Sequence, residues 1–385
     1  MAEQIELLGA GMKSEAKLLL YCARTQVEVV NTERITVFLR DNIDWDYLTR
    51  IASNHNLVPL IYRSLEAVDP IALPETVRKE FKKQIQVSVQ GNLFLTKELL
   101  QLLDLFDQYG IPVIPYKGPI LASSVYGDLA LRSFNDLDIF VHERDVLQAM
   151  DLLISCGYQL IRPKSVAQIE RNLQSRRINQ LIKKSLWAYQ LVLWHPERQG
   201  VVELHWRITP RYVFPNNPEQ LWEDLKPVKL GGATILSFSP ENLLWFLCVH
   251  GAKHQWKRLS WLCDLAELVR AHPRLNWEQI IAQAAKLGIE RRLYLGLFLA
   301  NYLLEAPIPR TIETKIHTTS QLKALAQQVI EKVFDDTEQI VRFPYLERFA
   351  FQLRAMDRMV DRGRYLLRFT NGVDIAAKAK RVSLH

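Results

Sequence analysis

Residues 132–141 read RSFNDLDIFV, and they give the main indication of the fold that we expect for the chain. Its second half is rich in the β-branched and aromatic residues that are typical of a strand. Two acids interrupt it, because Asp136 and Asp138 lie two residues apart, where the pleat of a strand points both carboxylates to one face. Like charges this close repel each other and are costly to desolvate. We therefore expect a cation between these carboxylates.

The segments around this stretch alternate between short apolar runs and helical patterns. The run KGPILASSVYG is typical of a helix opened by Gly118 and Pro119, since proline is tolerated in a first turn. Residues 143–156 have the spacing of an amphipathic helix. Two later apolar runs, separated by HPERQ, form a hairpin-like pair. The predicted strands of this small mixed sheet are 111–116, 132–141, 158–161, 188–194 and 200–206.

Helical patterns flank the predicted sheet on both sides. Apolar residues recur at helical spacing before residue 110, and the same spacing returns from Ser239 onward. The sequence therefore predicts an α+β fold in three parts: a helical N-terminal region at 1–110, an α/β core at 111–230 and a helical C-terminal region at 231–385.

Composition limits the class of protein. With 385 residues, of which 48% are hydrophobic, the chain can bury a large core in two or three domains. The net charge of +7 favours anionic ligands without telling nucleic acid from nucleotide or membrane surface. The four cysteines form no C-x-x-C pair, so we expect core thiols. No apolar stretch reaches the roughly 20 residues of a membrane span, and the N-terminus lacks the layout of a signal peptide, so we expect a cytoplasmic protein.

A third acid interrupts another apolar run. Glu203 lies within VVELHW (201–206), at a position along this run that matches the position of the two aspartates in theirs. Three carboxylates on one sheet face are expected to hold two Mg²⁺ ions, or Mn²⁺ in their place, because hard cations prefer oxygen ligands and leave room for substrate phosphates. This is the layout of a two-metal site for attack on phosphorus.

The same D-x-D spacing also occurs where no metal is expected. Asp44 and Asp46 in IDWDYL fit the first turn of an amphipathic helix, where acids complement the helix dipole and Asp44 can cap the first turn. The strand context, and not the spacing alone, therefore favours a metal site at Asp136 and Asp138.

Two further residues near the acids have two interpretations each. Arg132 lies four residues before Asp136, and its guanidinium either contacts phosphate oxygens or forms a salt bridge to one of the acids. His205 points to the same face as Glu203 by the strand period of two, where it either orients that acid or is a hydrogen-bonded core residue.

The pattern H-x-x-x-H appears once on a predicted helix. His250 and His254 in HGAKHQWKRLSWLCDL are spaced like the histidines of the zinc motif H-E-x-x-H, but position 251 is glycine and the general-base glutamate is missing. A zinc-dependent hydrolase is therefore the weakest of the functions considered.

Two segments are rich in basic residues. Residues 162–184 either guide an anionic acceptor such as RNA or form a solvated helix and loop. Residues 348–368 alternate arginines with apolar residues and either bind a membrane surface or a partner, or pair internally with Glu347, Asp357 and Asp361.

Together these motifs resemble a known family. The runs YKGPILASSVYGDLALRSFNDLDIFV, VELHWR and HGAKHQWKRLSWLCDLAEL are similar to the uncharacterised nucleotidyltransferase family of the DNA polymerase beta-like superfamily. That family carries Lys-Gly before a helix, Arg and D-x-D in the next strand, and a strand with acid-Leu-His-Trp. The resemblance covers roughly residues 30 to 300.

The resemblance implies transfer of a nucleoside monophosphate from an NTP such as ATP to an acceptor hydroxyl, with release of pyrophosphate. Asp136 and Asp138 match the metal-bridging acids, and Glu203 matches the third acid, which ligates the catalytic metal and helps to deprotonate the acceptor. The superfamily more often has Gly-Ser where this chain has Lys117 and Gly118. Gly118 lets backbone N–H groups approach a phosphate, and Lys117 neutralises the triphosphate.

The resemblance further implies that the helix carrying Lys253 and His254 closes over the nucleotide, with one of these two near the phosphates and Asp264 orienting the helix. The alternative is a helix that only packs its tryptophans on the core.

The sequence does not identify the acceptor, which is a small molecule, a protein hydroxyl or an RNA end. It also does not identify the NTP or the oligomeric state. A second hypothesis is that the chain is a catalytically silent module that binds nucleotide or RNA. The complete set of three acids argues against this hypothesis.

Overall fold

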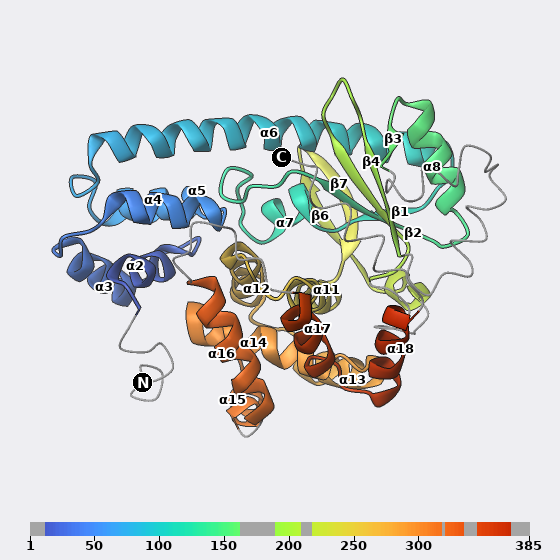
Figure 1. The fold of residues 1–385 in the computed structure, drawn as a ribbon. Helices are drawn as coiled ribbons and strands as arrows, with labels where there is room; N and C mark the ends of the chain where they lie inside the picture. Colours follow the sequence, from blue (N-terminus) through green and yellow to red (C-terminus); the bar gives the residue numbers. More distant parts are fainter. Residues whose placement is uncertain (1–11, 162–188, 209–217, 318–319, 335–344, 371–385) are drawn as a thin grey trace.

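The computed structural model contains a five-stranded sheet in the order β1-β2-β5-β4-β3, which lies in the right half of the view in Figure 1. Strands β2 and β5 pair in parallel, and the other neighbours in this sheet pair antiparallel. A separate antiparallel hairpin is formed by β6 and β7. The strands are β1 (Val113–Pro115), β2 (Leu137–Val141), β3 (Gln159–Leu160), β4 (Gln190–Trp194), β5 (Val201–His205), β6 (Leu225–Leu230) and β7 (Ala233–Phe238). The structure describes residues 12–161, 189–208, 218–317, 320–334 and 345–370.

Helices flank the sheet on both sequence sides. Before and within the sheet region lie α2 (Ser14–Cys22), α3 (Val29–Leu39), α4 (Trp45–Asn54), α5 (Val58–Val68), α6 (Glu75–Gln108), α7 (Gly118–Ser124), α8 (Val146–Ser155) and the 3-10 helix η2 (Pro218–Trp222). After it lie α11 (Pro240–Lys253), α12 (Leu259–Ala271), α13 (Trp277–Leu287), α14 (Glu290–Leu304), α15 (Arg310–His317), α16 (Ser320–Val333), α17 (Tyr345–Arg354) and α18 (Met359–Thr370). The predicted α+β class with flanking helices is confirmed.

Each predicted strand is present, but β2 is shorter than expected. It begins at Leu137, because the preceding loop is held in another conformation by Asn92 of α6. The side-chain amide of Asn92 donates hydrogen bonds to the carbonyl oxygens of Leu129, at 2.6 Å, and Arg132, at 2.9 Å. Asp136 therefore precedes the strand and only Asp138 lies within it.

The β6–β7 hairpin was not predicted. The β6 sequence LKPVKL contains a proline and two lysines, and most of its residues are exposed or half-buried, so no clear alternation marks it as a strand. The hairpin crosses the boundary that the sequence placed at residue 230. The boundaries at residues 110 and 230 stay predictions.

Helix α6 connects two buried clusters. Its 34 residues span about 50 Å at 1.5 Å per residue, and the helix lies along one side of the molecule from the N-terminal helices to the sheet (Figure 1). Phe81 packs into the helical cluster, whereas Leu99 and Phe106 pack into the cluster under the sheet. The single helix thereby fixes the sheet relative to the helices.

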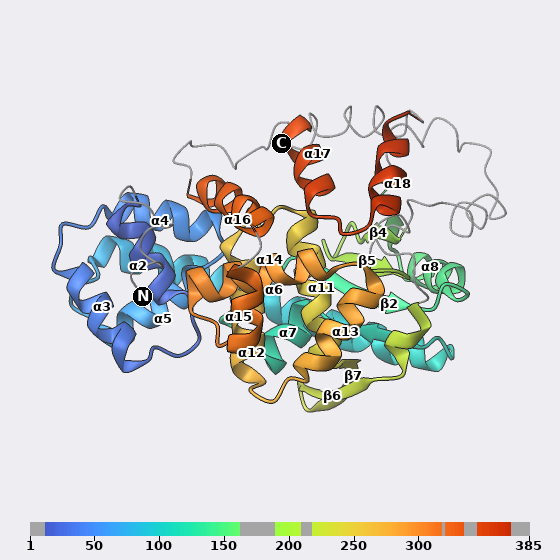
Figure 2. The ribbon, with the colours of Figure 1, turned by 90° about the horizontal axis from the view of Figure 1, so that it is seen from below.

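The helical cluster contains residues from both ends of the chain. Leu18 and Leu19 of α2 are buried in the same cluster as Leu262 of α12 and Leu297 of α14. Most side chains of α14 are buried, as expected for a helix that neighbours cover on all sides. Figure 2 shows α16, α17 and α18 along one edge of the molecule.

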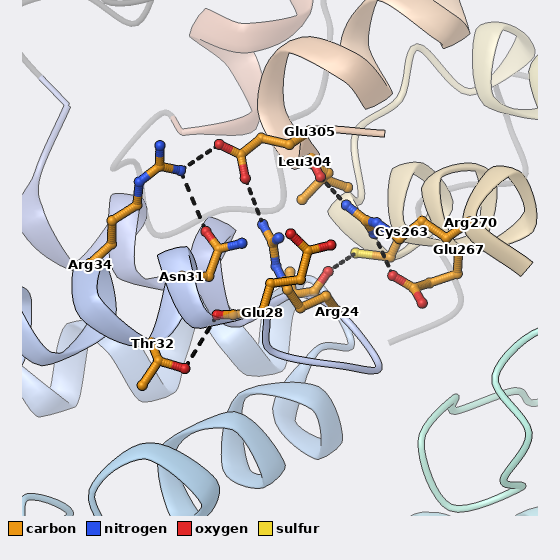
Figure 3. A network of polar contacts seen from close by, with 11 residues as sticks. Arg24, Glu28, Asn31, Thr32, Arg34, Cys263, Glu267, Arg270, Leu304 and Glu305 are labelled. Carbon is orange, nitrogen blue, oxygen red and sulfur yellow. Dashed lines mark hydrogen bonds and ion pairs between the residues drawn. The ribbon is translucent and has the colours of Figure 1, made fainter. Parts of the chain in front are cut away.

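A polar network joins the N-terminal helices to the C-terminal ones (Figure 3). Glu305 follows α14 with a left-handed φ of 56°, and its carboxylate accepts hydrogen bonds from Arg24 and Arg34. Arg270 of α12 donates to Glu267 and to the carbonyl oxygen of Leu304. Burial raises the pKa of Glu305, but the two arginines outweigh this effect and lower it, so the carboxylate is ionised at neutral pH.

The predicted helix cap is confirmed: Asp44 caps α4, since its carboxylate accepts a hydrogen bond from the backbone N–H of Tyr47 at 2.9 Å. All four cysteines are free thiols, and only Cys156 is more than slightly exposed. Within the described residues, we find no helix with both the length and the apolar character of a membrane span.

The two basic segments have different outcomes. Residues 162–184 lie outside the described residues, so their two interpretations stay predictions. Within residues 348–368, one of the expected internal ion pairs is confirmed, that of Asp361 with Arg364 at 3.4 Å. Glu347 and Asp357 pair instead with residues of other helices, Lys332 of α16 at 3.0 Å and Arg291 of α14 at 3.8 Å.

Candidate metal and nucleotide site

Asp138 and Glu203 are neighbours across the parallel pair of strands β2 and β5. The two residues are direct register partners, so their side chains leave the sheet on the same face. The five residues of β2 are all buried, which places Asp138 in a nearly water-free position with 4% of its surface exposed. Glu203 is half-buried, with 26% of its side chain exposed.

His205 completes a group of three possible metal ligands. Its Nε2 lies 3.2 Å from Oδ1 of Asp138 and 3.3 Å from Oε2 of Glu203. The three ligand atoms all lie within 4.8 Å of one another. Neighbouring ligands of an octahedral metal, each about 2.1 Å from it, lie about 3 Å apart. The group therefore fits a divalent cation, and the prediction that His205 shares a face with Glu203 is confirmed.

Asp136 lies beside this group but is not part of it. It precedes β2, is half-buried and lines the same cavity as the other acids. Burial and the charge of Asp138 raise its pKa to about 6, whereas the pKa of Asp138 is lowered because Lys117 and His205 outweigh burial. Of the three predicted ligands the structure thus gathers Asp138 and Glu203, and the metal-binding role of Asp136 stays a prediction.

Lys117 and Gly118 bring the turn before α7 against the acids. Nζ of Lys117 lies 2.8 Å from Oδ1 of Asp138, and the hydroxyl of Tyr116 donates to the same oxygen at 3.3 Å. Gly118 has a φ of +48°, and a Cβ there would lie 3.2 Å from the carbonyl oxygen of Asp136. Glycine therefore permits the close approach of this turn to the D-x-D segment.

Arg132 forms a salt bridge, but not to the acids that the sequence suggested. Its Nε and Nη2 donate to the two carboxylate oxygens of Asp264 on α12, at 2.7 and 2.9 Å. Tyr126 donates to the same carboxylate at 2.7 Å. The third nitrogen, Nη1, is buried without a hydrogen-bond partner among the described residues. Asp264 thus holds Arg132 on the cavity wall.

Helix α11 and the residue after it contribute His250, Lys253 and His254 to the lining of the same cavity. Lys253 donates a hydrogen bond to the hydroxyl of Tyr189, and burial lowers its pKa to about 8. Burial also lowers the pKa values of His250 and His254 well below the usual value. Both histidines are therefore neutral at pH 7, so Lys253 is the cation of this group. In the described residues, neither histidine belongs to a group of possible metal ligands.

These side chains line one cavity of about 500 Å³. The sequence patterns did not predict Tyr116 or Tyr189 at this cavity, although Tyr116 directly precedes Lys117 in the YKG motif. It also did not foresee that the turn between α4 and α5 would contribute Asn56 and Leu57 from the N-terminal helical region. The remaining cations of the wall come from distant segments: Arg258 before α12 and Arg348 on α17.

Comparison with known proteins gives one family match. The family described as "Uncharacterised nucleotidyltransferase" matches residues 41–305, which is more than half of the chain and includes all the side chains above except Arg348. Among curated proteins, none matches this chain.

Proposed function

The chain belongs to the family of uncharacterised nucleotidyltransferases, and from this membership we propose that it moves a nucleoside monophosphate from an NTP to an acceptor hydroxyl. One observation carries the proposal: the group Asp138, Glu203 and His205, of which Asp138 and His205 are buried, lines a cavity that is also lined by cations. A volume of about 500 Å³ lies within the range of roughly 300–1,000 Å³ of small-molecule sites. An acidic centre with basic walls suits a metal-bound triphosphate.

The residues that hold the metals in this proposal are Asp136, Asp138 and Glu203. Asp138 and Glu203 carry lowered pKa values and are ionised at neutral pH, and Asp136, with a pKa of about 6, is largely ionised at pH 7. Bound Mg²⁺ or Mn²⁺ would polarise the reacting phosphoryl group and offset the charge of the leaving pyrophosphate.

The proposed reaction forms one bond and breaks another. The acceptor oxygen bonds to the α-phosphorus, the bond between this phosphorus and the oxygen bridging to the β-phosphorus breaks, and pyrophosphate leaves with the bonding electrons. The acceptor hydroxyl loses its proton to the carboxylate of Glu203. This carboxylate is ionised, and Glu203 is the most exposed of the three residues in the group, with 26% of its side chain exposed.

Three cationic groups are proposed to bind the phosphates. Lys117 and Lys253 both line the cavity, and Nη1 of Arg132 is a buried donor on its wall. Charge-assisted hydrogen bonds of this kind are the strong ones for phosphate oxygens. His254 contributes as a neutral hydrogen-bonding group, and the backbone at Gly118 allows close approach of the phosphates.

The proposal is tested by incubating the protein with each of the four NTPs labelled at the α-phosphate, with Mg²⁺ and a cell extract as the source of acceptors. Label should enter a product with the wild type but not with Asp138→Asn. Asp46→Asn serves as a matched control, because Asp46 belongs to the exposed D-x-D pair at the start of α4. Binding of metal and NTP without any label transfer would instead support a silent nucleotide-binding module.

A further inference from the structure

We propose that His205 is itself a metal ligand through Nε2, together with Asp138 and Glu203, and that this nitrogen makes the site prefer Mn²⁺ to Mg²⁺. The inference rests on the proposed metal site and names its cation. It differs from an all-carboxylate site in that one ligand is an imidazole.

The geometry places Nε2 between the two carboxylates. It lies 3.2 Å from Oδ1 of Asp138 and 3.3 Å from Oε2 of Glu203, so it is nearly equidistant from both. A cation within about 2.2 Å of all three atoms would meet them as neighbouring ligands of an octahedron. A histidine that only oriented Glu203 would need a contact with one carboxylate, not with two.

The hydrogen-bonding state of the ring supports the same assignment. His205 is buried, with 4% of its surface exposed, and neither ring nitrogen makes a hydrogen bond of good geometry to another described residue. Nε2 is at ion-pair distance from both acids but forms no hydrogen bond with either of them that meets standard geometric limits. Buried polar atoms are normally paired, and a metal ion bound by Nε2 would satisfy this one.

The sheet and two tyrosines hold the ring in place. His205 ends β5 between two neighbours, with Phe140 of β2 and Gln190 of β4 as its register partners. The ring of Tyr116 packs edge-on against it at 5.7 Å, and that of Tyr189 lies at 6.2 Å. A ligand on a rigid element keeps its direction, as metal sites require.

The ligand set selects among the cations. Mg²⁺ prefers oxygen ligands and is reluctant to lose its water, so a nitrogen ligand adds little to its affinity. First-row metals such as Mn²⁺ bind imidazole, and Mn²⁺ also accepts carboxylates, water and phosphate oxygens in an octahedral arrangement. Of the two cations proposed for this site, Mn²⁺ is therefore favoured over Mg²⁺ by two carboxylates and one imidazole.

The test is Mn²⁺ binding to the full chain, followed by electron paramagnetic resonance. Pulsed spectra of the Mn²⁺-loaded wild type should contain a ¹⁴N coupling, which should change when the protein carries ¹⁵N-labelled histidine. His205→Gln should lose the coupling and bind Mn²⁺ at least about tenfold more weakly, with a much smaller change for Mg²⁺.

His142→Gln is the matched control, because His142 is also buried and its Nδ1 lies 2.9 Å from one carboxylate, that of Glu219. This variant should keep the nitrogen coupling. If His205→Gln does not fold, the ¹⁵N-histidine sample and the double variant His250→Gln/His254→Gln, which should keep the coupling, still decide the matter. Absence of nitrogen coupling in the wild type, its loss in the double variant, or its persistence in a folded His205→Gln would overturn the inference.

The outcomes separate this inference from the proposed function. Label transfer with no nitrogen coupling would leave the nucleotidyltransferase standing and remove His205 as a ligand. Nitrogen coupling with no label transfer would establish the histidine-containing metal site and refute the proposed reaction.

Discussion

The ammonium of Lys117 lies 2.8 Å from Oδ1 of Asp138. The same oxygen is a proposed metal ligand, so this lysine and a metal ion compete for one carboxylate. Burial lowers the pKa of Lys117, but Asp138 and Asp136 outweigh burial and raise it, so the side chain remains charged.

We expect Lys117→Met to bind Mn²⁺ about tenfold more tightly in the absence of nucleotide. Tenfold corresponds to about 1.4 kcal/mol, a modest part of the roughly 4 kcal/mol between unit charges at 4 Å near a protein surface. The same variant should bind the metal–NTP complex more weakly, because a phosphate-binding cation is lost. Isothermal titration calorimetry measures both affinities.

Lys226→Met is the control for this prediction, because Lys226 forms an ion pair of the same length, 2.8 Å, with Asp224 on the exposed β6–β7 hairpin. In Lys226→Met, neither the affinity for Mn²⁺ nor the affinity for the metal–NTP complex should change. An unchanged or lower Mn²⁺ affinity of Lys117→Met would show that the lysine does not compete for Asp138.

Lys253 should make NTP binding depend on pH. Because burial lowers its pKa to about 8, the ammonium form dominates at pH 7 and the neutral amine at pH 9. The cation is present below the pKa and lost above it, so affinity for Mg²⁺–NTP should fall as pH rises from 7 to 9. Lys253→Arg should abolish most of this fall, since arginine keeps its charge. Equal pH profiles of the two proteins would remove Lys253 from phosphate binding.

The pair of Arg132 and Asp264 should stabilise the fold as well as the site. Asp264→Asn leaves the buried guanidinium without its bidentate partner, and breaking a buried pair in this way costs about 3–5 kcal/mol. Urea unfolding should show this loss. Glu75→Gln is the comparison, because Glu75 pairs with Arg78 and Lys79 on the surface, where such pairs contribute about 0–1 kcal/mol. Similar losses in both variants would contradict the burial argument.

Position 251 should not tolerate a residue larger than glycine. An added Cβ would lie 2.3 Å from the ring of Trp256, which is itself buried and has a left-handed φ of 50°. We expect Gly251→Ala to destabilise the protein by about 3 kcal/mol, the upper end for overpacking. Gly91→Ala in α6 has open space around the new methyl and should be neutral or stabilising by up to about 1 kcal/mol. Thermal unfolding compares the two, and a stable Gly251→Ala would mean that Trp256 can move.

Much of the fold follows from local sequence patterns. The run LDIFV has the composition of a buried strand and forms one, and VVELHW pairs beside it. The period of two correctly places His205 beside Glu203, because strand geometry alone sets that relationship.

The contacts that sequence reasoning missed join segments far apart in the chain. Arg132 and Asp264 are separated by 132 residues, and Asn92 fixes the loop before β2 from a distance of 37–40 residues. No local period encodes such pairs, because they depend on how the helices dock on the sheet. The same docking decides that Asp136 precedes the strand and that Tyr189 and the turn between α4 and α5 complete the cavity.

The proposed activity is group transfer, as opposed to nucleotide binding alone or hydrolysis. The most direct measurement counts pyrophosphate released and α-phosphate label bound to acceptor in the same reaction, with the wild type and with Glu203→Gln. We expect equal amounts of both with the wild type, and a rate at least about a hundredfold lower with Glu203→Gln, because a positioned general base contributes about 10²–10⁴-fold. Label that appears only as free nucleoside monophosphate, or equal rates for the two proteins, would contradict it.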